Sequence, residues 1–308
     1  MSTATLNGAA PSPSLRTWVL ATRPKTLSAG VVPVAVGTAL AFALGQGHLG
    51  AAAAALVGAL LIQIGTNLTN DYYDWKKGAD TRERLGPVRV TQAGLIAPRA
   101  VFRAAIASFA LAFAVGMYLV AIAGWPIFAV GVLSLLFGYA YTGGPFPLGY
   151  NGLGDAFVFV FFGLVAVAGT FYVQALSLPV VALIAGVPVG ALAVALLVVN
   201  NLRDVHTDAP VGKRTLVVRF GTRAGKWEYV LMLALSYATP LLLWVTGEAS
   251  WLVLLPWVSA PLAFSPLRIV FRESGAILNT ALAGTARLLL VFGLLFAAGL
   301  YLGVGAVG

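Results

Sequence analysis

The sequence predicts an all-α, polytopic membrane protein whose helices form a single bundle, and three observations support this prediction. The chain has 308 residues, of which 60% are hydrophobic and only 9% are charged, whereas about a quarter of the residues in an ordinary soluble domain are charged. Three long stretches contain no Asp, Glu, Lys or Arg. The charges are concentrated in short segments between such stretches, which is typical of a chain that crosses a bilayer repeatedly.

The lengths of the uncharged stretches predict nine membrane-spanning helices. The stretches cover residues 26–70, 104–154 and 156–202. They contain 45, 51 and 47 residues, and one crossing takes about 20 residues, so each stretch holds two helices and a turn. A fourth pair is predicted over 229–267, interrupted by Glu248, and a last span over about 280–302. We expect a single membrane-embedded domain over 1–308.

The polar segment 1–22 precedes the first span and lacks the charged, apolar and cleavage regions of a signal peptide. The first apolar stretch is therefore expected to remain as a helix. With a cytoplasmic N-terminus, 18 of the 19 basic residues lie at the cytoplasmic side, and Arg287 lies within the last helix. This positive-inside pattern predicts a multi-pass protein of the cytoplasmic membrane. It also explains the net charge of +9 without a nucleic-acid partner.

Two cytoplasmic loops, 75–100 and 203–227, are especially rich in charge, and a short pattern recurs where each begins. Asn67 and Asp71 are four positions apart, as are Asn200 and Asp204, and the two pairs are displaced by 133 positions. This offset is close to four predicted helices. We therefore expect two four-helix pseudo-repeats plus a ninth helix, with an active site at the interface of the repeats.

Five of the six Asp residues fall in these two clusters. With two Asn residues they form the candidate metal-site set Asn67, Asp71, Asp74, Asp80, Asn200, Asp204 and Asp208. Helical spacing places most of each cluster on one stripe, whereas Gly78 is expected to end the first helix, so that Asp80 comes from a loop. The alternative is that these carboxylates are solvated at the membrane interface or paired with loop arginines.

The chemistry of this set indicates a hard cation. The chain has no Cys, and its two His residues are His48, in a predicted outside turn, and His206, which is either a ligand or a surface residue. Carboxylate and amide oxygens suit Mg²⁺, which usually shares them with the phosphates of a substrate. A Mg²⁺-bound diphosphate is therefore the predicted guest. It also needs cations around it, and the candidates are Lys25, Lys76, Lys77, Arg89, Lys213 and Arg219. For any one of these residues alone the pattern favours a solvated loop charge, whereas for the set as a whole it favours phosphate binding.

Two stretches carry a family resemblance. "NLTNDYYDWKKGADTRERLGPVRVTQAGLI" (67–96) and "NNLRDVHTDAPVGKRTLVVRFG" (200–221) resemble the two aspartate-rich motifs of the UbiA-type intramembrane prenyltransferases. "RPKTL" (23–27) and "YTGGPFPLGYNGLGD" (141–155) also resemble that family. All four are most similar to the branch that uses 1,4-dihydroxy-2-naphthoate as the acceptor.

The resemblance implies a Mg²⁺-dependent transfer of a polyprenyl group from polyprenyl diphosphate to 1,4-dihydroxy-2-naphthoate, with loss of diphosphate and CO₂, giving demethylmenaquinone. It implies a nine-helix bundle with an apolar tunnel for the lipid tail. It carries over the seven Asn and Asp residues as the metal site, with Asp71, Asp74, Asp204 and Asp208 as catalytic residues. The groups implied to neutralise the diphosphate are Lys25, Lys77, Arg89, Lys213 and Arg219.

The acceptor side of such a reaction has fewer candidates. Tyr72, Tyr73, Tyr139 and Tyr141 offer aromatic faces to an allylic cation, although Tyr is also common at membrane interfaces. Asp155 either positions the acceptor or caps the helix that it begins. Other readings of the chain are prenyl transfer to 4-hydroxybenzoate, homogentisate or haem, phytyl transfer, and a secondary transporter. A transporter usually places its ion sites near mid-membrane, whereas these aspartates lie at helix ends.

Overall fold

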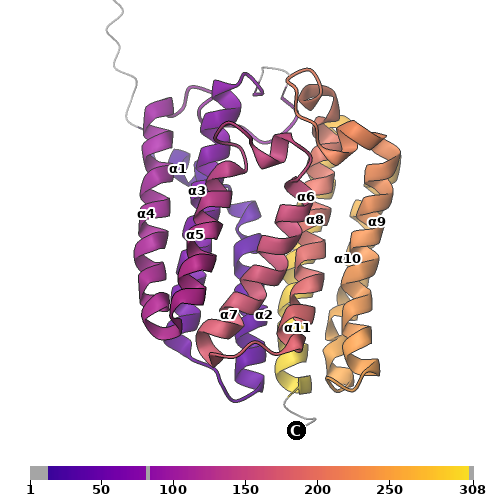
Figure 1. Cartoon of the computed structure of the whole chain (residues 1–308). Coiled ribbons are helices and arrows are strands. Elements are labelled where there is room, and N and C mark those ends of the chain that lie inside the picture. Colours follow the sequence, from indigo (N-terminus) through magenta and orange to yellow (C-terminus); the bar gives the residue numbers. More distant parts are fainter. Residues whose placement is uncertain (1–12, 81–83, 305–308) are drawn as a thin grey trace, which may run out of the picture.

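The computed structural model describes residues 13–80 and 84–304, and within these residues the chain folds into helices without a strand (Figure 1). The elements in chain order are α1 (Leu15–Thr22), η1 (Pro24–Thr26), α2 (Ser28–Ala43), α3 (Leu49–Lys76), α4 (Pro98–Ala123), α5 (Trp125–Ala140), η2 (Leu148–Tyr150), α6 (Gly154–Val158), the π-helical segment η3 (Phe159–Val165), α7 (Ala166–Ala175), α8 (Val180–Asp208), α9 (Leu216–Val245), η4 (Trp251–Ser259), α10 (Ala260–Arg272), η5 (Gly275–Ile277) and α11 (Leu278–Val304).

The apolar stretches of the sequence form the long helices of the bundle. Within the described residues, seven segments are long and apolar enough to cross a membrane: α3, α4, α6 to α7, α8, α9, η4 to α10, and η5 to α11. Two further apolar helices, α2 and α5, have 16 residues each. The expected all-helical fold is confirmed.

The helix α8 lies at the centre of this bundle. In its most apolar 18 residues, 61% of the residues are buried inside the protein, the largest share among the seven candidate spans. It packs against α9, α11, α2 and the π-helical segment η3. The core around it includes Leu192, Phe171, Phe292 and Phe296, which are fully buried. In a bilayer, dense side-chain packing of this kind holds helices together, because lipid is as apolar as the core.

Glycine allows α8 to approach η3 closely. A Cβ atom on Gly163 would lie 2.6 Å from the Cα of Gly190 and 2.7 Å from the carbonyl oxygen of Gly186. Small residues at such crossings let two helix backbones touch. The π-helical segment η3 also brings Phe161 and Phe162 to the internal cavities described below.

The end of α3 places the last aspartate of the first cluster on a loop, as expected. Gly78 has φ +69°, a left-handed conformation that glycine adopts without a steric penalty. The backbone N–H of Ala79 then donates to the carbonyl oxygen of Asp74 at 2.8 Å, closing the helix end. Asp80 therefore lies beyond the helix and turns back toward it.

The segment 203–227, expected to be a loop, is mostly helical. The helix α8 continues through Asp208 and α9 begins directly after Thr215, so only 209–215 lie between the two helices, although Gly221, with φ 86° and ψ 165°, kinks α9 near its start. Thr215 caps α9, because its Oγ1 accepts a hydrogen bond from the N–H of Val218 at 3.3 Å. The charged residues that follow the apolar part of α8 therefore form the end of α8 and the first turns of α9. The loop is shorter than the charge pattern indicated.

The expected polar segment 1–22 contains α1, which packs against α3, and its residues 1–12 lie outside the described part of the chain. Figure 1 shows the connections after α3, α5 and α8 at one end of the bundle, while α11 ends at the opposite end. The two aspartate clusters therefore lie at the same end.

Candidate active site

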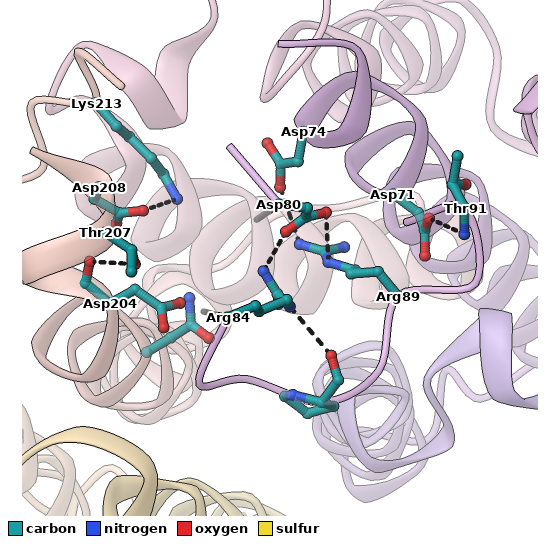
Figure 2. Close-up of polar contacts among 12 residues, drawn as sticks. Asp71, Asp74, Asp80, Arg84, Arg89, Thr91, Asp204, Thr207, Asp208 and Lys213 are labelled. Atoms are coloured by element: carbon teal, nitrogen blue, oxygen red, sulfur yellow. Dashed lines mark hydrogen bonds and ion pairs between the residues drawn. The ribbon is translucent and has the colours of Figure 1, made fainter. Parts of the chain in front are cut away.

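The first aspartate cluster holds the loop that follows α3. Asn67, Asp71 and Asp74 are all buried on this helix. The carboxylate of Asp71 accepts a hydrogen bond from the backbone N–H of Val90 at 3.1 Å. It accepts a second from the backbone N–H of Thr91 at 3.0 Å (Figure 2). Backbone donors on a charged acceptor make strong hydrogen bonds. Asp71 therefore anchors the loop after α3 to the helix.

Asp74 and Asp80 are both paired with arginines of the same loop. Arg89 donates from Nη2 to Oδ2 of Asp74 at 2.9 Å, and its Nε lies 3.4 Å from Oδ2 of Asp80. Arg84 forms a second ion pair with Asp80 (Figure 2). The hydroxyl of Tyr150, from the loop between α5 and α6, donates to Oδ1 of Asp74 at 2.8 Å. The carboxylates of the first cluster thus lie in a compact network of cations and donors.

Asn67 connects this cluster to the N-terminal helices. Its Nδ2 donates to the carbonyl oxygen of Thr22 at 3.0 Å and to Oγ1 of Thr26 at 3.1 Å. The amide nitrogen is therefore committed to α1 and η1, and the amide oxygen is the atom that this side chain offers to a ligand.

The second cluster is built around a buried arginine. Arg203, only 1% exposed, binds the Asp204 carboxylate through Nε at 2.8 Å and Nη2 at 2.6 Å. Nη2 also donates to Oδ1 of Asn200 at 2.6 Å, and Nη1 donates to Oδ1 of Asn279 on α11 at 2.9 Å. Asn279 in turn donates to the carbonyl oxygen of Leu85 at 2.7 Å. One chain of hydrogen bonds therefore connects the second cluster to the loop held by the first.

Asp208 completes the second cluster one turn beyond Asp204. Its Oδ1 lies 3.2 Å from Nζ of Lys213 (Figure 2), and its Oδ2 has no hydrogen-bond partner among the described residues. His206, between the two aspartates, is exposed. Of the two alternatives for His206, a metal ligand or a surface residue, its position on α8 is that of a surface residue.

Burial and neighbouring charge alter the pKa values of the loop residues. Burial raises the pKa of Asp80 to about 6, although the adjacent Arg84 opposes the shift. Burial lowers the pKa of Lys77, against the attraction of Asp74. Burial also acts to lower the pKa of Lys213, but Asp208 and other nearby carboxylates outweigh it and raise the pKa. Lys213 therefore stays protonated and is available to bind an anion.

Two cavities meet beneath these residues. The polar cavity has a volume of about 220 Å³, and its walls include Asn67, Asp74, Arg89, Asp155, Asn200 and Lys213. The apolar cavity has a volume of about 230 Å³ and lies among α2, α3, α4, α5 and α7. Six residues, here called the neck, line both cavities: Ala29, Gln63, Thr66, Tyr141, Val158 and Phe162. The arrangement suits a ligand with a charged head and a long apolar tail.

Several aromatic side chains line the apolar cavity. Phe113 and Phe128 line it on α4 and α5, and Phe137, Phe157 and Phe161 line it near the neck. The rings of Phe157 and Phe161 are nearly parallel, with centroids 5.9 Å apart. These surfaces offer no charged side chain to a guest, so this cavity fits hydrocarbon.

The predicted basic residues occupy different positions. Nζ of Lys77 donates to the carbonyl oxygen of Thr142 at 2.7 Å and lies 4.3 Å from the centre of the Tyr150 ring. Arg219 is exposed and donates to the backbone carbonyl oxygen of Asn151 at 2.7 Å, outside the polar cavity. The side chain of Lys25 lies outside the described part of the structure.

Of the residues predicted to contact the acceptor, some line a cavity and others do not. Tyr141 lies in the neck, and Asp155 lines the polar cavity with Oδ1 buried and without a hydrogen-bond partner among the described residues. Tyr72 packs on Phe102, with ring centroids 4.8 Å apart, and lines neither cavity. Tyr139 also lines neither cavity, and its hydroxyl bonds that of Tyr73.

Sequence reasoning missed Tyr150, Arg203 and Asn279 as site residues. Tyr150 lies in the Gly-rich stretch 141–155 that carries the family resemblance, and Arg203 lies inside the second motif, so both stretches held a signal. Asn279 is an isolated Asn at the start of the last span, and no pattern in the sequence distinguishes it.

The donor chemistry of the site fits Mg²⁺. Within the described residues no three His, Cys, Asp or Glu side chains converge on one metal position; instead the carboxylates pair with arginine and lysine. Oδ2 of Asp80 and Oδ2 of Asp208 are buried oxygens without a hydrogen-bond partner there. Mg²⁺ typically takes one or two carboxylates and completes its shell with water and substrate phosphates. These separate carboxylates match that requirement.

Comparison with known proteins identifies the family. Residues 30–276 match the UbiA prenyltransferase family. The chain belongs to this family. It is 40% identical to the 1,4-dihydroxy-2-naphthoate octaprenyltransferase of Mycobacterium tuberculosis, over 83% of this chain and 85% of that protein. It is 38% identical to the 1,4-dihydroxy-2-naphthoate octaprenyltransferase of Escherichia coli, over 92% of this chain and 95% of that protein.

The fold of this UbiA-family chain is also similar to a solved structure. A UbiA homologue from Archaeoglobus fulgidus bound to GPP and Mg²⁺ superposes with a TM-score of 0.61. The match covers 91% of this chain and 99% of the homologue, at 16% sequence identity. At this identity the likeness concerns the UbiA fold.

Proposed function

We propose that this protein transfers a polyprenyl group from polyprenyl diphosphate to 1,4-dihydroxy-2-naphthoate, releasing diphosphate and CO₂ and giving the quinol form of demethylmenaquinone, a step of menaquinone biosynthesis. Two relatives, at 38% and 40% identity, are named 1,4-dihydroxy-2-naphthoate octaprenyltransferase, and the matches cover most of each chain. The neck that joins the polar and apolar cavities is the observation that carries the proposal. It provides a place where a diphosphate head and a hydrocarbon tail bind together.

The head of the donor binds between the two aspartate clusters in this proposal. The residues that hold Mg²⁺ are Asn67, Asp71, Asp74, Asp80, Asn200, Asp204 and Asp208. Asp71 also positions the loop, through its bonds to Val90 and Thr91. When bound, Mg²⁺ neutralises the negative charge that develops on the leaving diphosphate. A homologue with this fold binds GPP and Mg²⁺, which supports the assignment.

The cations of the loops bind the diphosphate. Lys213 and Arg89 line the polar cavity, and each is paired with a cluster carboxylate. Lys77 lies over the ring of Tyr150 beside them. We assign these three residues to the leaving group, because Lys and Arg stabilise phosphate oxygens by charge-assisted hydrogen bonds. Lys25 belongs to the same proposal, whereas Arg219 acts by holding the loop that contains Asn151.

The acceptor binds at the neck, where the first carbon of the donor tail emerges from the polar cavity. Asp155, on the wall of the polar cavity, has a carboxylate oxygen without a hydrogen-bond partner among the described residues, and this oxygen accepts a hydrogen bond from an acceptor hydroxyl. Tyr141 presents its ring in the neck to the allylic cation. Phe162 excludes water there, which protects the cation from capture. Tyr72 and Tyr139 support the neighbouring packing from outside the cavities.

The topology forms part of the proposal. The seven long segments and the shorter α2 and α5 each cross the bilayer, giving nine crossings of a single domain. Four helices in each half form the pseudo-repeats, and α11 is the ninth helix. The N-terminus and the active-site end face the cytoplasm, because the loops at that end carry nearly all of the basic residues.

The absence of natural cysteine makes the topology easy to test. Single Cys residues introduced as Gln46→Cys and Ala209→Cys lie at opposite ends of the bundle, both at exposed positions. In intact cells of a bacterial host, a membrane-impermeant maleimide is expected to label Gln46→Cys and to spare Ala209→Cys. Labelling of Ala209→Cys alone would reverse the proposed orientation.

The reaction is tested with purified protein, 1,4-dihydroxy-2-naphthoate and a long-chain polyprenyl diphosphate, with and without Mg²⁺. We expect Mg²⁺-dependent formation of the prenylated quinol, CO₂ and diphosphate. Diphosphate release that requires 4-hydroxybenzoate, homogentisate or haem instead would move the acceptor elsewhere in the family, and a preference for phytyl diphosphate would change the donor. Failure to release diphosphate from any donor and acceptor pair would contradict a prenyltransferase function and favour a transporter.

A further inference from the structure

Arg23 differs from the other cations of the polar cavity. Among the described residues, Arg23, Arg84, Arg89 and Lys213 line this cavity, and the last three form ion pairs with carboxylates. Arg23 forms no ion pair within 4.0 Å in this part of the chain; its guanidinium donates from Nη2 to the carbonyl oxygen of Asn67, at a long 3.5 Å. Arg23 is therefore a cation without a bound anion on the cavity wall.

The backbone of Arg23 is held in an unusual conformation. Its φ of 54° and ψ of 68° lie in the left-handed region, which non-glycine residues rarely adopt. The residue ends α1, and its carbonyl oxygen accepts hydrogen bonds from Oγ1 of Thr26 at 3.0 Å and from the backbone N–H of Thr26 at 2.9 Å. Strain of this kind is concentrated at ligand sites. Here it turns the chain sharply between α1 and η1 and places the side chain against α3.

Polar groups continue from Arg23 to the neck. Thr26, three residues after Arg23, also lines the polar cavity, and Ala29 lines the neck. On the facing helix α3, Thr66 and Gln63 lie in the neck, and Oε1 of Gln63 is buried without a hydrogen-bond partner among the described residues. Between Arg23 and the neck the cavity thus presents a cation, two hydroxyl groups and an amide oxygen that has no hydrogen-bond partner among the described residues.

We propose that Arg23 binds the carboxylate of the aromatic acceptor. This inference rests on the proposed function, in which the acceptor is a hydroxylated aromatic carboxylate. A guanidinium binds a carboxylate through two parallel hydrogen bonds, so the ring is fixed in its plane as well as by charge. With its carboxylate bound to Arg23, the aromatic ring of the acceptor extends past Thr26 toward the neck. Its hydroxyl groups then face Gln63 and Asp155, and its carboxyl-bearing edge remains beside the head of the donor.

The burial of Arg23 favours an anion at this position. Burial lowers the pKa of Arg23, with a smaller contribution from the charge of Arg84, and the carboxylates of Asp71, Asp74 and Asp80 oppose this shift only in part. A cation in such surroundings is stabilised by a bound counter-ion. The proposed function assigns the donor diphosphate to Lys213 and Arg89, which pair with the cluster carboxylates. Arg23 is the cavity cation left over for a second anionic group.

The proposal is tested by binding, without donor and without turnover. The probes are 1-hydroxy-2-naphthoate, which keeps the carboxylate and its neighbouring hydroxyl, and 1-naphthol, which lacks the carboxylate. Inorganic pyrophosphate with Mg²⁺ reports on the donor-head site. The variants are Arg23→Met, which keeps the apolar stem, and Arg23→Lys, which keeps the charge without the planar fork. Arg99→Met, an exposed cation at the start of α4, is the matched control.

We expect Arg23→Met to weaken 1-hydroxy-2-naphthoate binding by about 10- to 100-fold, the usual effect of losing hydrogen bonds between charged groups. Binding of 1-naphthol and of pyrophosphate is expected to change by less than about 2-fold, because neither uses the Arg23 fork. Arg23→Lys is expected to fall between Arg23→Met and the wild-type protein. Arg99→Met is expected to match the wild-type protein with all three probes. Thermal unfolding of each variant shows that the bundle is intact.

Several results would overturn the proposal. Loss of pyrophosphate binding in Arg23→Met with naphthoate binding retained would assign Arg23 to the donor. Equal weakening of 1-hydroxy-2-naphthoate and 1-naphthol would give Arg23 a purely structural role. A wild-type protein that binds neither naphthalene compound, but binds pyrophosphate, would contradict the naphthoate acceptor itself. If instead the wild-type protein and Arg23→Met bind 1-hydroxy-2-naphthoate equally tightly, that result contradicts only the role of Arg23 and leaves the naphthoate acceptor in place.

Discussion

Arg203 donates two hydrogen bonds, of 2.8 and 2.6 Å, to the carboxylate of its sequence neighbour Asp204. Adjacent helix residues normally point in different directions, so the long arginine side chain must fold along α8 to make this contact. The remaining nitrogen of its guanidinium bonds Asn279, which bonds the carbonyl oxygen of Leu85. Arg203 therefore links the second cluster to α11 and to the loop of the first cluster.

Asn279→Ala tests this link. The change removes an acceptor from Arg203 and a donor from Leu85, and a hydrogen bond to a charged group is worth ~1.5–3 kcal/mol. We expect turnover to fall at least about tenfold, and Asn279→Asp, which keeps the acceptor for Arg203, to retain more activity. Steady-state kinetics in detergent or nanodiscs measure the effect. The matched control is Thr280→Ala at the exposed neighbouring position; if it loses as much activity, the link has no special role.

Asp204→Ala is expected to abolish turnover almost completely while the protein still inserts and folds. The variant loses a proposed Mg²⁺ ligand and leaves the buried Arg203 without its carboxylate. Breaking a buried ion pair costs ~3–5 kcal/mol, so the thermal midpoint should fall as well. Asp204→Asn keeps the shape of the side chain and separates the two effects. A folded Asp204→Asn variant with the wild-type rate would remove Asp204 from the metal site.

Tyr150→Phe is expected to weaken use of the donor by about tenfold in kcat/KM, since the hydroxyl that bonds Asp74 at 2.8 Å is lost. The ring still lies under Lys77 and Lys213, whose Nζ atoms are 4.3 and 5.6 Å from its centre. Tyr150→Leu also removes these cation–π contacts, each worth about 0.5–2 kcal/mol. Kinetics with varied polyprenyl diphosphate should therefore rank the three proteins in this order. Equal activity of Phe and Leu variants would exclude a role for the ring.

The pH dependence of Mg²⁺ use should reflect Asp80. Its pKa is raised to about 6 by burial, and a carboxylate must lose its proton to bind a metal. As the pH falls below about 6, protons compete with Mg²⁺, so the Mg²⁺ concentration for half-maximal activity should rise by roughly tenfold per pH unit. Titrations of Mg²⁺ between acidic and neutral pH measure this. In Asp80→Asn the residual activity should lose this dependence; an unchanged profile would assign it to another group.

Gly190→Ala should destabilise the bundle. A Cβ on Gly190 would lie 2.6 Å from the carbonyl oxygen of Phe159, a backbone atom that cannot move away easily, and overpacking costs ~1–3 kcal/mol. Gly169→Ala is the control, because nothing lies within 4 Å of its Cβ position. Thermal unfolding should show a lower midpoint for Gly190→Ala and an equal or higher one for Gly169→Ala. The reverse order would contradict the close packing of α8 on η3.

The sequence alone determined the all-helical fold, the order of the apolar helices and the two aspartate clusters. These features follow from local chemistry, because about 20 uncharged residues suit one crossing and helical spacing places Asn67, Asp71 and Asp74 on one stripe. The exposed position of His206, a question that the sequence left open, depends on which face of α8 meets the bundle. The length of the segment between α8 and α9 was overestimated, since charged residues continue both helices.

Only the tertiary structure decided which atoms meet. The carboxylates that the sequence assigned to a metal are bound by Arg84, Arg89, Arg203 and Lys213. Tyr150 reaches Asp74 across 76 positions, and Asn279 reaches Leu85 across 194. Such contacts depend on how the helices pack and on where each loop returns, and no local pattern encodes either. The same packing leaves Arg23 without an ion pair among the described residues and joins the polar and apolar cavities at one neck.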